Sequence, residues 1–176
     1  MDPIIAFAGP TKSGKTTLAK KLAATLGFGF GSFGERVRKE AARRGLRHAS
    51  RKQLQTLGEE MVKSDKNTFC QEVLQDADFR PGHGLVLDGI RHIDILSLIK
   101  DLVRPQTVRL VYVESPVADR VKRNRSDLPQ IQEIDSHPVE RDAARLKSAA
   151  DLFLDTSKEE QATFQTLLQW AKAGAK

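Results

Sequence analysis

Short apolar segments alternate with amphipathic stretches along the chain. Residues 4–8 and 85–87 are consecutive apolar runs, which are typical of strands covered on both faces. Between such runs, Leu18, Leu22 and Leu26 recur at helical spacing. The strands are expected at residues 4–8, 28–30, 85–87, 107–113 and 152–154. This alternation predicts an α/β fold with three α/β/α layers and a five-stranded parallel sheet.

Serine residues mark the expected starts of three helices. Ser32 and Ser50 are each followed three residues later by Glu or Gln, the pattern of a capping box. The first helix should run to about Arg44, and the second should be longer, with a break near residues 65–67. Ser157 is expected to cap the last helix, and the other helices are expected at residues 93–102, 117–125 and 139–150.

Residues 127–138 differ from the rest of the chain because they are polar and show little periodicity. This stretch contains Pro129, which breaks the interior of a helix. We therefore expect residues 127–138 to form a loop.

Size and composition narrow the class of protein. A chain of 176 residues is expected to fold as a single domain, residues 1–176. No apolar run approaches the roughly 20 residues that cross a bilayer, so no membrane partner is expected. The N-terminal residues lack the basic segment of a signal peptide, and Cys70 is the single cysteine. These features lead us to expect a cytoplasmic protein.

The net charge of +6 is concentrated in two segments. Residues 35–52 contain eight basic and two acidic residues, and residues 119–125 contain four basic residues and one acid. Clustered arginines indicate a phosphate-bearing partner, because a guanidinium matches phosphate oxygens with two parallel hydrogen bonds. A solvated helix face or a nucleic-acid surface would show the same charge, so motifs must decide between them.

A phosphate-binding loop follows the first strand. Gly9 and Gly14-Lys15-Thr16 match the P-loop pattern, with a strand before it and a helix after it. Backbone N–H groups of such a loop surround the phosphates of ATP, while Lys15 reaches the β- and γ-phosphates and Thr16 holds Mg²⁺. The residues expected to bind ATP are Gly9, Pro10, Thr11, Lys12, Ser13, Gly14, Lys15, Thr16 and Thr17.

Asp88 directly follows the buried run of residues 85–87. A carboxylate at this end of a parallel strand is placed to orient Mg²⁺ and its water beside the triphosphate. Asp88 is therefore the second candidate metal residue beside Thr16, although an acid that merely caps a helix would occupy the same position.

Three further segments, together with the P-loop, carry a resemblance to a known family. They are Ser32-Phe33-Gly34-Glu35-Arg36-Val37-Arg38, then Asp88-Gly89-Ile90-Arg91, then residues 119–125. In this order and spacing they resemble the nucleoside monophosphate kinase family, which includes the adenylate kinases. The resemblance implies a P-loop NTPase fold, helices for the phosphate acceptor at about residues 32–78, and a short lid at about residues 120–140.

The resemblance also implies roles for individual residues. Arg38 and Arg91 are expected to bind the acceptor phosphate, and Arg120 with Arg123 or Arg125 to close over the charge that develops during transfer. The residues implied at the acceptor site are Phe33, Gly34, Arg38, Asp88, Arg91 and Arg145. Those implied in catalysis are Lys15, Arg91, Arg120, Arg123 and Arg125.

The expected function is transfer of the γ-phosphoryl group of ATP to a nucleoside or deoxynucleoside monophosphate. Asp88-Gly89-Ile90-Arg91 lacks the proline of the family pattern, and with His92 it is also similar to deoxynucleotide monophosphate kinases and dephospho-CoA kinases. The alternatives are therefore a kinase for another small acceptor such as dephospho-CoA, and a P-loop NTPase that binds nucleic acid through residues 36–52. Small molecules are the expected partners, and nucleic acid is not.

Overall fold

The computed structural model describes residues 1–124, 128–137, 142 and 145–174, without the side chains of residues 123, 124, 130 and 134. Of the helix expected at residues 139–150, residues 139–141, 143 and 144 lie outside the described residues. Its last turn is described and forms a 3₁₀ helix, η1 (Leu146–Ala149).

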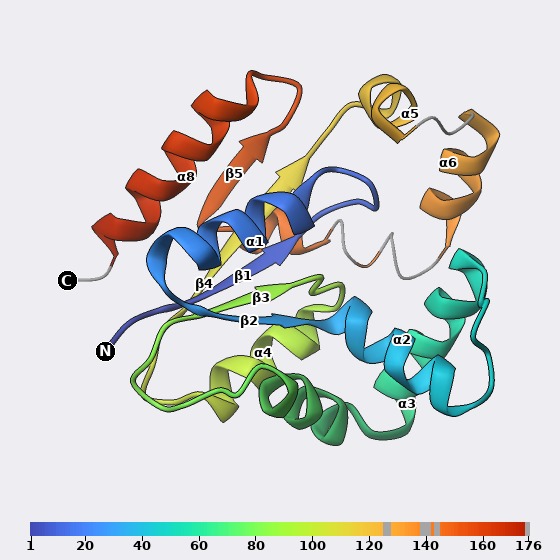
Figure 1. Cartoon of the computed structure of the whole chain (residues 1–176), viewed down its shortest axis with the longest axis horizontal. Coiled ribbons are helices and arrows are strands. Elements are labelled where there is room, and N and C mark those ends of the chain that lie inside the picture. The colour runs from blue at the N-terminus through green and yellow to red at the C-terminus, as the bar shows by residue number, and fades with distance from the viewer. Residues whose placement is uncertain (125–127, 138–141, 143–144, 175–176) are drawn as a thin grey trace.

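A five-stranded parallel sheet forms the centre of the molecule (Figure 1). The strands are β1 (Ile4–Ala8), β2 (Gly29–Ser32), β3 (Leu85–Asp88), β4 (Val108–Glu114) and β5 (Leu152–Asp155). Their order across the sheet is β2-β3-β1-β4-β5, and every neighbouring pair is parallel. The α/β fold with five parallel strands is thus confirmed, with strand boundaries that differ from those expected by one or two residues.

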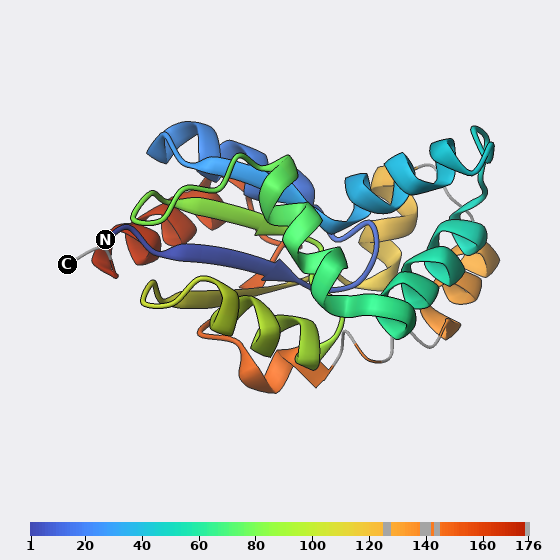
Figure 2. The same cartoon turned by 90° about the horizontal axis from the view of Figure 1, so that it is seen from below.

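Helices cover both faces of this sheet (Figures 1 and 2). The side chains of β1 alternate between the two cores. Ile5 and Phe7 pack with α1 (Lys15–Leu26) and α8 (Glu160–Ala173). Ile4, Ala6 and Ala8 pack on the other side, with α3 (Arg51–Asp76) and α4 (Ile93–Leu102). Because both faces of β1 are buried, its sequence is continuously apolar.

Helices α2 (Phe33–Arg43) and α3 form a hairpin beyond the carboxyl end of β2 (Figure 2). Ser32 accepts a hydrogen bond from the N–H of Glu35, and Ser50 forms a complete capping box with Gln53. The expected break in the second helix is confirmed at Asp65, which has non-helical backbone angles within α3. Asp65 accepts hydrogen bonds from the N–H and hydroxyl of Thr68 and so caps the helical segment that follows.

Two expectations for the second half of the chain are wrong. Residues 128–136, expected as a loop, form helix α6 (Leu128–Ser136), which follows α5 (Val117–Asn124). Pro129 lies in the first turn of α6, where its missing N–H removes no helical hydrogen bond, and Ile131 is buried. The last helix begins after Glu159 without a side-chain cap, so Ser157 does not cap it.

None of the helices in the described part of the chain is long and apolar enough to cross a membrane.

Candidate active site

A cleft opens at the carboxyl ends of β1, β2 and β3, where parallel α/β sheets bind their ligands. Its walls are the P-loop, the first residues after β2 and β3, and the facing sides of α2 and α3. Of the expected site residues, those that line it are Thr11, Lys12, Lys15, Thr16, Phe33, Gly34, Arg38, Asp88 and Arg91. The structure therefore brings half of the expected site residues to one cleft.

The P-loop needs glycine at both of its ends. Gly9 has a φ of 135°, and a Cβ atom there would lie 2.0 Å from the carbonyl oxygen of Val113. Gly14 has a φ of 88° and precedes the first residue of α1. Since only glycine adopts these angles without strain, the two residues allow the loop to turn tightly from β1 into α1.

Lys15, Thr16 and Asp88 lie at the base of the cleft. Lys15 is only 6% exposed, and its Nζ donates a hydrogen bond of 2.9 Å to the carbonyl oxygen of Pro10. The hydroxyl of Thr16 donates to Oδ2 of Asp88 at 2.6 Å. Asp88 is 4% exposed, and its Oδ1 is buried with no hydrogen-bond partner among the described residues. A hydroxyl and a buried carboxylate with an unused oxygen are suitable ligands for Mg²⁺ beside a triphosphate.

Within the described residues, no cluster of three or more His, Cys, Asp or Glu side chains could hold a metal ion by itself.

Three guanidinium groups surround Thr11 in the P-loop. Arg51 and Arg91 both donate to the Thr11 hydroxyl oxygen, at 2.8 Å and 3.2 Å. Arg120 donates to the Thr11 carbonyl at 3.1 Å. We call Thr11 and these three arginines the Thr11 cluster. Arg38 reaches the same cleft from α2.

Arg120 is 3% exposed, although it carries a charge. Its NH1 and NH2 groups both donate to the carboxylate of Asp135 on α6, the first at 2.9 Å. Such a two-pronged contact fixes the plane of the guanidinium. Arg120 therefore has a defined orientation at the edge of the P-loop.

The far half of the cleft is mainly apolar. Phe33 and Phe69 meet edge to face with ring centroids 5.4 Å apart. Other apolar side chains from α2, α3 and α4 line the same region, and Gln55 adds a buried amide. The lining residues of this half are Phe33, Val37, Leu54, Gln55, Val62, Phe69 and Ile95.

The remaining expected residues lie elsewhere or outside the description. The side chain of Arg145 is 78% exposed and pairs with Asp142 at 3.2 Å, away from the lining of the cleft. Arg125 lies outside the described residues, as does the side chain of Arg123. Gly9, Pro10, Ser13, Gly14 and Thr17 belong to the P-loop and the start of α1 without lining the cleft.

Sequence reasoning missed four residues of this site. Arg51 was counted in the basic segment 35–52 and given no role of its own, although it directly follows the N-cap Ser50 and begins α3. The hydroxyl of Thr156 donates to the carbonyl of Ser13 at 2.9 Å and supports the P-loop from the end of β5. No motif in the sequence marks Gln55 or Asp135 as a site residue, because only the packing of α3 and α6 brings them to the active site.

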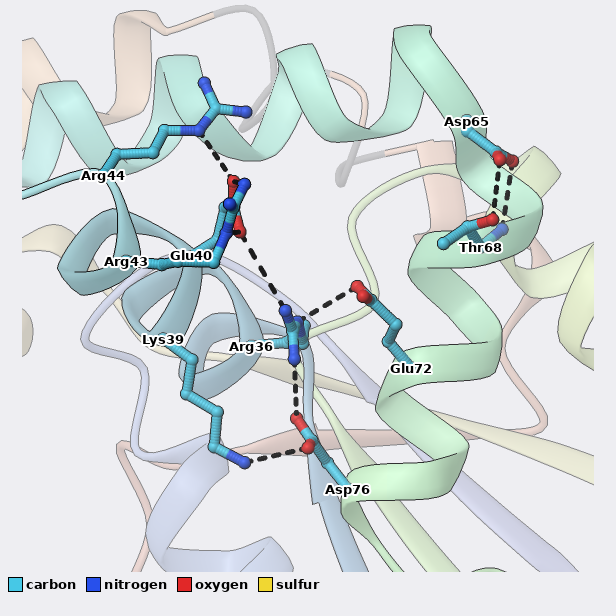
Figure 3. A network of polar contacts seen from close by, with 9 residues as sticks. All are labelled: Arg36, Lys39, Glu40, Arg43, Arg44, Asp65, Thr68, Glu72 and Asp76. Atoms are coloured by element: carbon cyan, nitrogen blue, oxygen red, sulfur yellow. Dashed lines mark hydrogen bonds and ion pairs between the residues drawn. The ribbon is translucent and has the colours of Figure 1, made fainter.

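Most of the basic segment 35–52 is paired within the protein (Figure 3). Glu40 is buried and accepts hydrogen bonds from Arg43 and Arg44, which lower its pKa from 4.5 to about 2. Further ion pairs join α2 to acids of α3. We call this set the α2–α3 ion-pair network; its members are Arg36, Lys39, Glu40, Arg43, Arg44, Glu60, Glu72 and Asp76.

Comparison of the sequence with known protein families identifies the family of this chain. Residues 5–146 match the AAA domain family AAA_18, and the chain belongs to that family. No curated protein matches the sequence closely enough to count as a relative.

Solved structures of several kinases share the fold over nearly the whole chain. Shikimate kinase from Aquifex aeolicus is 20% identical with a TM-score of 0.56, each chain being covered to 98%. Shikimate kinase from Bacteroides thetaiotaomicron is 14% identical with a TM-score of 0.62, covering 97% of this chain and 98% of its own. A gluconokinase from Sinorhizobium meliloti is 11% identical with a TM-score of 0.56, covering 98% and 93%. The fold of this chain is thus the P-loop α/β fold.

Proposed function

We propose that the protein transfers the γ-phosphoryl group of ATP to the phosphate of a nucleoside or deoxynucleoside monophosphate. The observation that carries the proposal is the Thr11 cluster. Arg51 and Arg91 place two positive charges on one neutral hydroxyl oxygen of the P-loop. Guanidinium groups bind phosphate through charge-assisted hydrogen bonds, and a phosphate bound by these arginines would lie beside the P-loop, which binds the phosphates of ATP.

ATP and Mg²⁺ occupy the P-loop side of the cleft in this proposal. Backbone N–H groups of residues 9–16 bind the phosphates, and Lys15 leaves the Pro10 carbonyl to reach the β- and γ-phosphates. Thr16 and Asp88 hold Mg²⁺, directly and through water. The metal supplies positive charge that neutralises the phosphate oxygens as the bond to the leaving group breaks.

The acceptor phosphate binds to Arg38, Arg51 and Arg91, and Gly34 lies beside the guanidinium of Arg38. Among the described residues that line the cleft, Asp88 is the only carboxylate, and it accepts the hydrogen bond of the Thr16 hydroxyl. A hydroxyl acceptor requires a base to remove its proton, whereas a phosphate is already an anion and requires none. The surplus of arginines over carboxylates therefore favours a phosphate acceptor.

The apolar half of the cleft accommodates the rest of the acceptor. Phe33 and Phe69 provide aromatic surface, and Gln55 provides one amide for hydrogen bonding. A planar base attached to an anionic phosphate fits this division between an apolar and a cationic half.

The reaction then needs positioning more than acid–base chemistry. The arginines hold the acceptor phosphate in line with the γ-phosphorus, and Arg120 stabilises the charge that spreads over the transferred group. One bond forms between an acceptor oxygen and the γ-phosphorus, and the bond to the β-phosphate oxygen breaks, giving ADP and a nucleoside diphosphate.

A small hydroxyl acceptor is the second candidate. The shikimate kinases and the gluconokinase that share the fold phosphorylate, by their names, molecules of this kind. In that case Asp88 and His92 are the described cleft residues able to act as base. The nucleic-acid alternative loses support, because the basic residues of the α2–α3 ion-pair network face carboxylates of the same protein.

A coupled ADP-release screen separates these candidates. The purified protein is given ATP and Mg²⁺ with each ribonucleoside and deoxyribonucleoside monophosphate, dephospho-CoA, shikimate or gluconate. We expect at least one nucleoside monophosphate to raise ADP release well above the rate with ATP alone. Stimulation by shikimate, gluconate or dephospho-CoA, without stimulation by nucleotides, would replace the proposal by the second candidate. ATP hydrolysis that no acceptor stimulates would contradict both.

A further inference from the structure

The orientation of Arg120 depends on a helix that the sequence had suggested was a loop. Arg120 leaves α5, and the carboxylate that it contacts belongs to Asp135 near the end of α6. A buried arginine is costly unless its charge is paired and its N–H groups are hydrogen-bonded. Asp135 supplies the paired charge, and the Thr11 carbonyl supplies a further acceptor.

Helix α6 is itself held against the acceptor side of the cleft. His137, at its end, lies 3.7 Å from a carboxylate oxygen of Glu59 on α3. Glu133 lies 4.0 Å from the ammonium group of Lys52, also on α3. Asp135 therefore lies on a helix that contacts the α2–α3 hairpin. Its carboxylate contacts Arg120, which lies beside the P-loop.

We infer that Asp135 is a positioning residue, which holds the guanidinium of Arg120 against the P-loop in the orientation required for phosphoryl transfer. This inference rests on the proposed function. An arginine fixed in advance loses no side-chain entropy and needs no rearrangement when charge develops on the transferred group. Asp135 thus acts through Arg120 and makes no contact with the substrates itself.

The principal test compares Asp135→Asn with the wild type. Asparagine keeps the size of the side chain and one acceptor oxygen, but loses the charge and one half of the two-pronged contact. We expect kcat to fall about tenfold while KM for ATP changes less than about threefold. Asp135→Glu, which keeps the carboxylate, should recover part of the lost kcat. Gln132→Ala, an exposed position of the same helix, is the control and should leave kcat unchanged.

A double-mutant cycle distinguishes positioning from a general effect on folding. Arg120→Ala alone should lower kcat about 100-fold, and adding Asp135→Asn to it should lower kcat no further. If Asp135→Asn has the same effect with and without Arg120, or if kcat stays at or above the wild-type value, the inference is wrong. Thermal unfolding of each variant shows whether the protein remains folded.

A binding measurement keeps this test independent of the acceptor. ADP, Mg²⁺ and aluminium fluoride together imitate the transferred phosphoryl group on the P-loop, and their affinity can be measured by calorimetry without any acceptor. We expect Asp135→Asn to weaken this complex about tenfold and the ADP complex by less than threefold. Equal affinities for the complex in wild type and variant would overturn the inference. If no acceptor is found but Asp135→Asn still weakens the aluminium fluoride complex, the proposed function is wrong and the inference about Asp135 stands.

Discussion

Two arginine-rich regions of the molecule differ in what faces their positive charges. In the α2–α3 ion-pair network, Arg36, Arg43 and Arg44 meet the carboxylates of Glu40 and Glu72 (Figure 3). In the Thr11 cluster, Arg51 and Arg91 meet a hydroxyl oxygen of the P-loop. The first region holds two helices together, whereas the second presents positive charge to the cleft. Clustered arginines in a sequence therefore do not predict a ligand by themselves, because the fold can place acids opposite them.

The largest effect is expected for Lys15→Ala, within the cleft. Removal of this charge should lower kcat by 100-fold or more, since an interaction with the transferred phosphate contributes several kcal/mol to the transition state. Thermal unfolding of the variant separates this loss from any change of stability. Steady-state kinetics measure the loss. Lys20→Ala, an exposed residue of the same helix, is the control, and near-normal turnover of folded Lys15→Ala would contradict the mechanism.

Arg51 and Arg43 allow the two regions to be compared directly. Arg51→Ala should raise KM for the acceptor about 10- to 100-fold, because it removes one charge-assisted hydrogen bond to the acceptor phosphate. Arg43→Ala, whose side chain is 72% exposed and bound to Glu40, should leave KM for the acceptor within about twofold. Kinetics at varied acceptor concentration measure both values. Equal effects of the two substitutions would remove the distinction between the regions.

Glu40→Gln should act on stability and leave turnover unchanged. The substitution removes the carboxylate that pairs with Arg43 and Arg44, and we expect it to destabilise the fold by about 1–2 kcal/mol. Urea denaturation measures the change. Glu60→Gln, which removes one exposed partner of Arg44, is the control and should cost less. A large loss of activity at full stability would assign the network to the active site instead.

The smallest expected effect is a change of stability with pH. Hydrogen bonds from Arg43 and Arg44 lower the pKa of Glu40 from 4.5 to about 2 in the folded protein. The stabilisation by Glu40 is therefore complete above about pH 4.5 and is lost as the pH falls toward 2. The difference in unfolding free energy between wild type and Glu40→Gln should shrink over this window. A difference that stays constant down to pH 2 would show that the charge of Glu40 is not its source.

Local sequence was sufficient to predict the P-loop and the end of β3. The P-loop residues Gly9, Gly14, Lys15 and Thr16 lie close together in the chain. The position of Asp88 is set by β3, of which it is the last residue. Their places follow from backbone geometry and strand direction, which are encoded by neighbouring residues. Strands β1 and β3 were found for a similar reason, because each begins with a short run of buried apolar residues.

Contacts between distant segments were not predictable in this way. Arg51 reaches Thr11 across 40 positions of the chain, and only the docking of the α2–α3 hairpin brings them together. The contact of Asp135 with Arg120 was not predicted, because Pro129 suggested a loop at this point of the chain. Proline in the first turn of a helix is, however, compatible with α6. The pairing of Arg36 with Glu72 likewise needs the hairpin to form before its charges can be assigned.

The position of the transferred phosphate tests the central claim most directly. Phosphorus NMR of a mixture of protein, ATP, Mg²⁺ and the nucleoside monophosphate that stimulates ADP release identifies the new bond. We predict signals of a nucleoside diphosphate, whose phosphorus atoms are joined through one oxygen, in equal amount to ADP. A new phosphate ester on a hydroxyl group, or inorganic phosphate alone, would contradict the assignment of the Thr11 cluster and Arg38 to an acceptor phosphate.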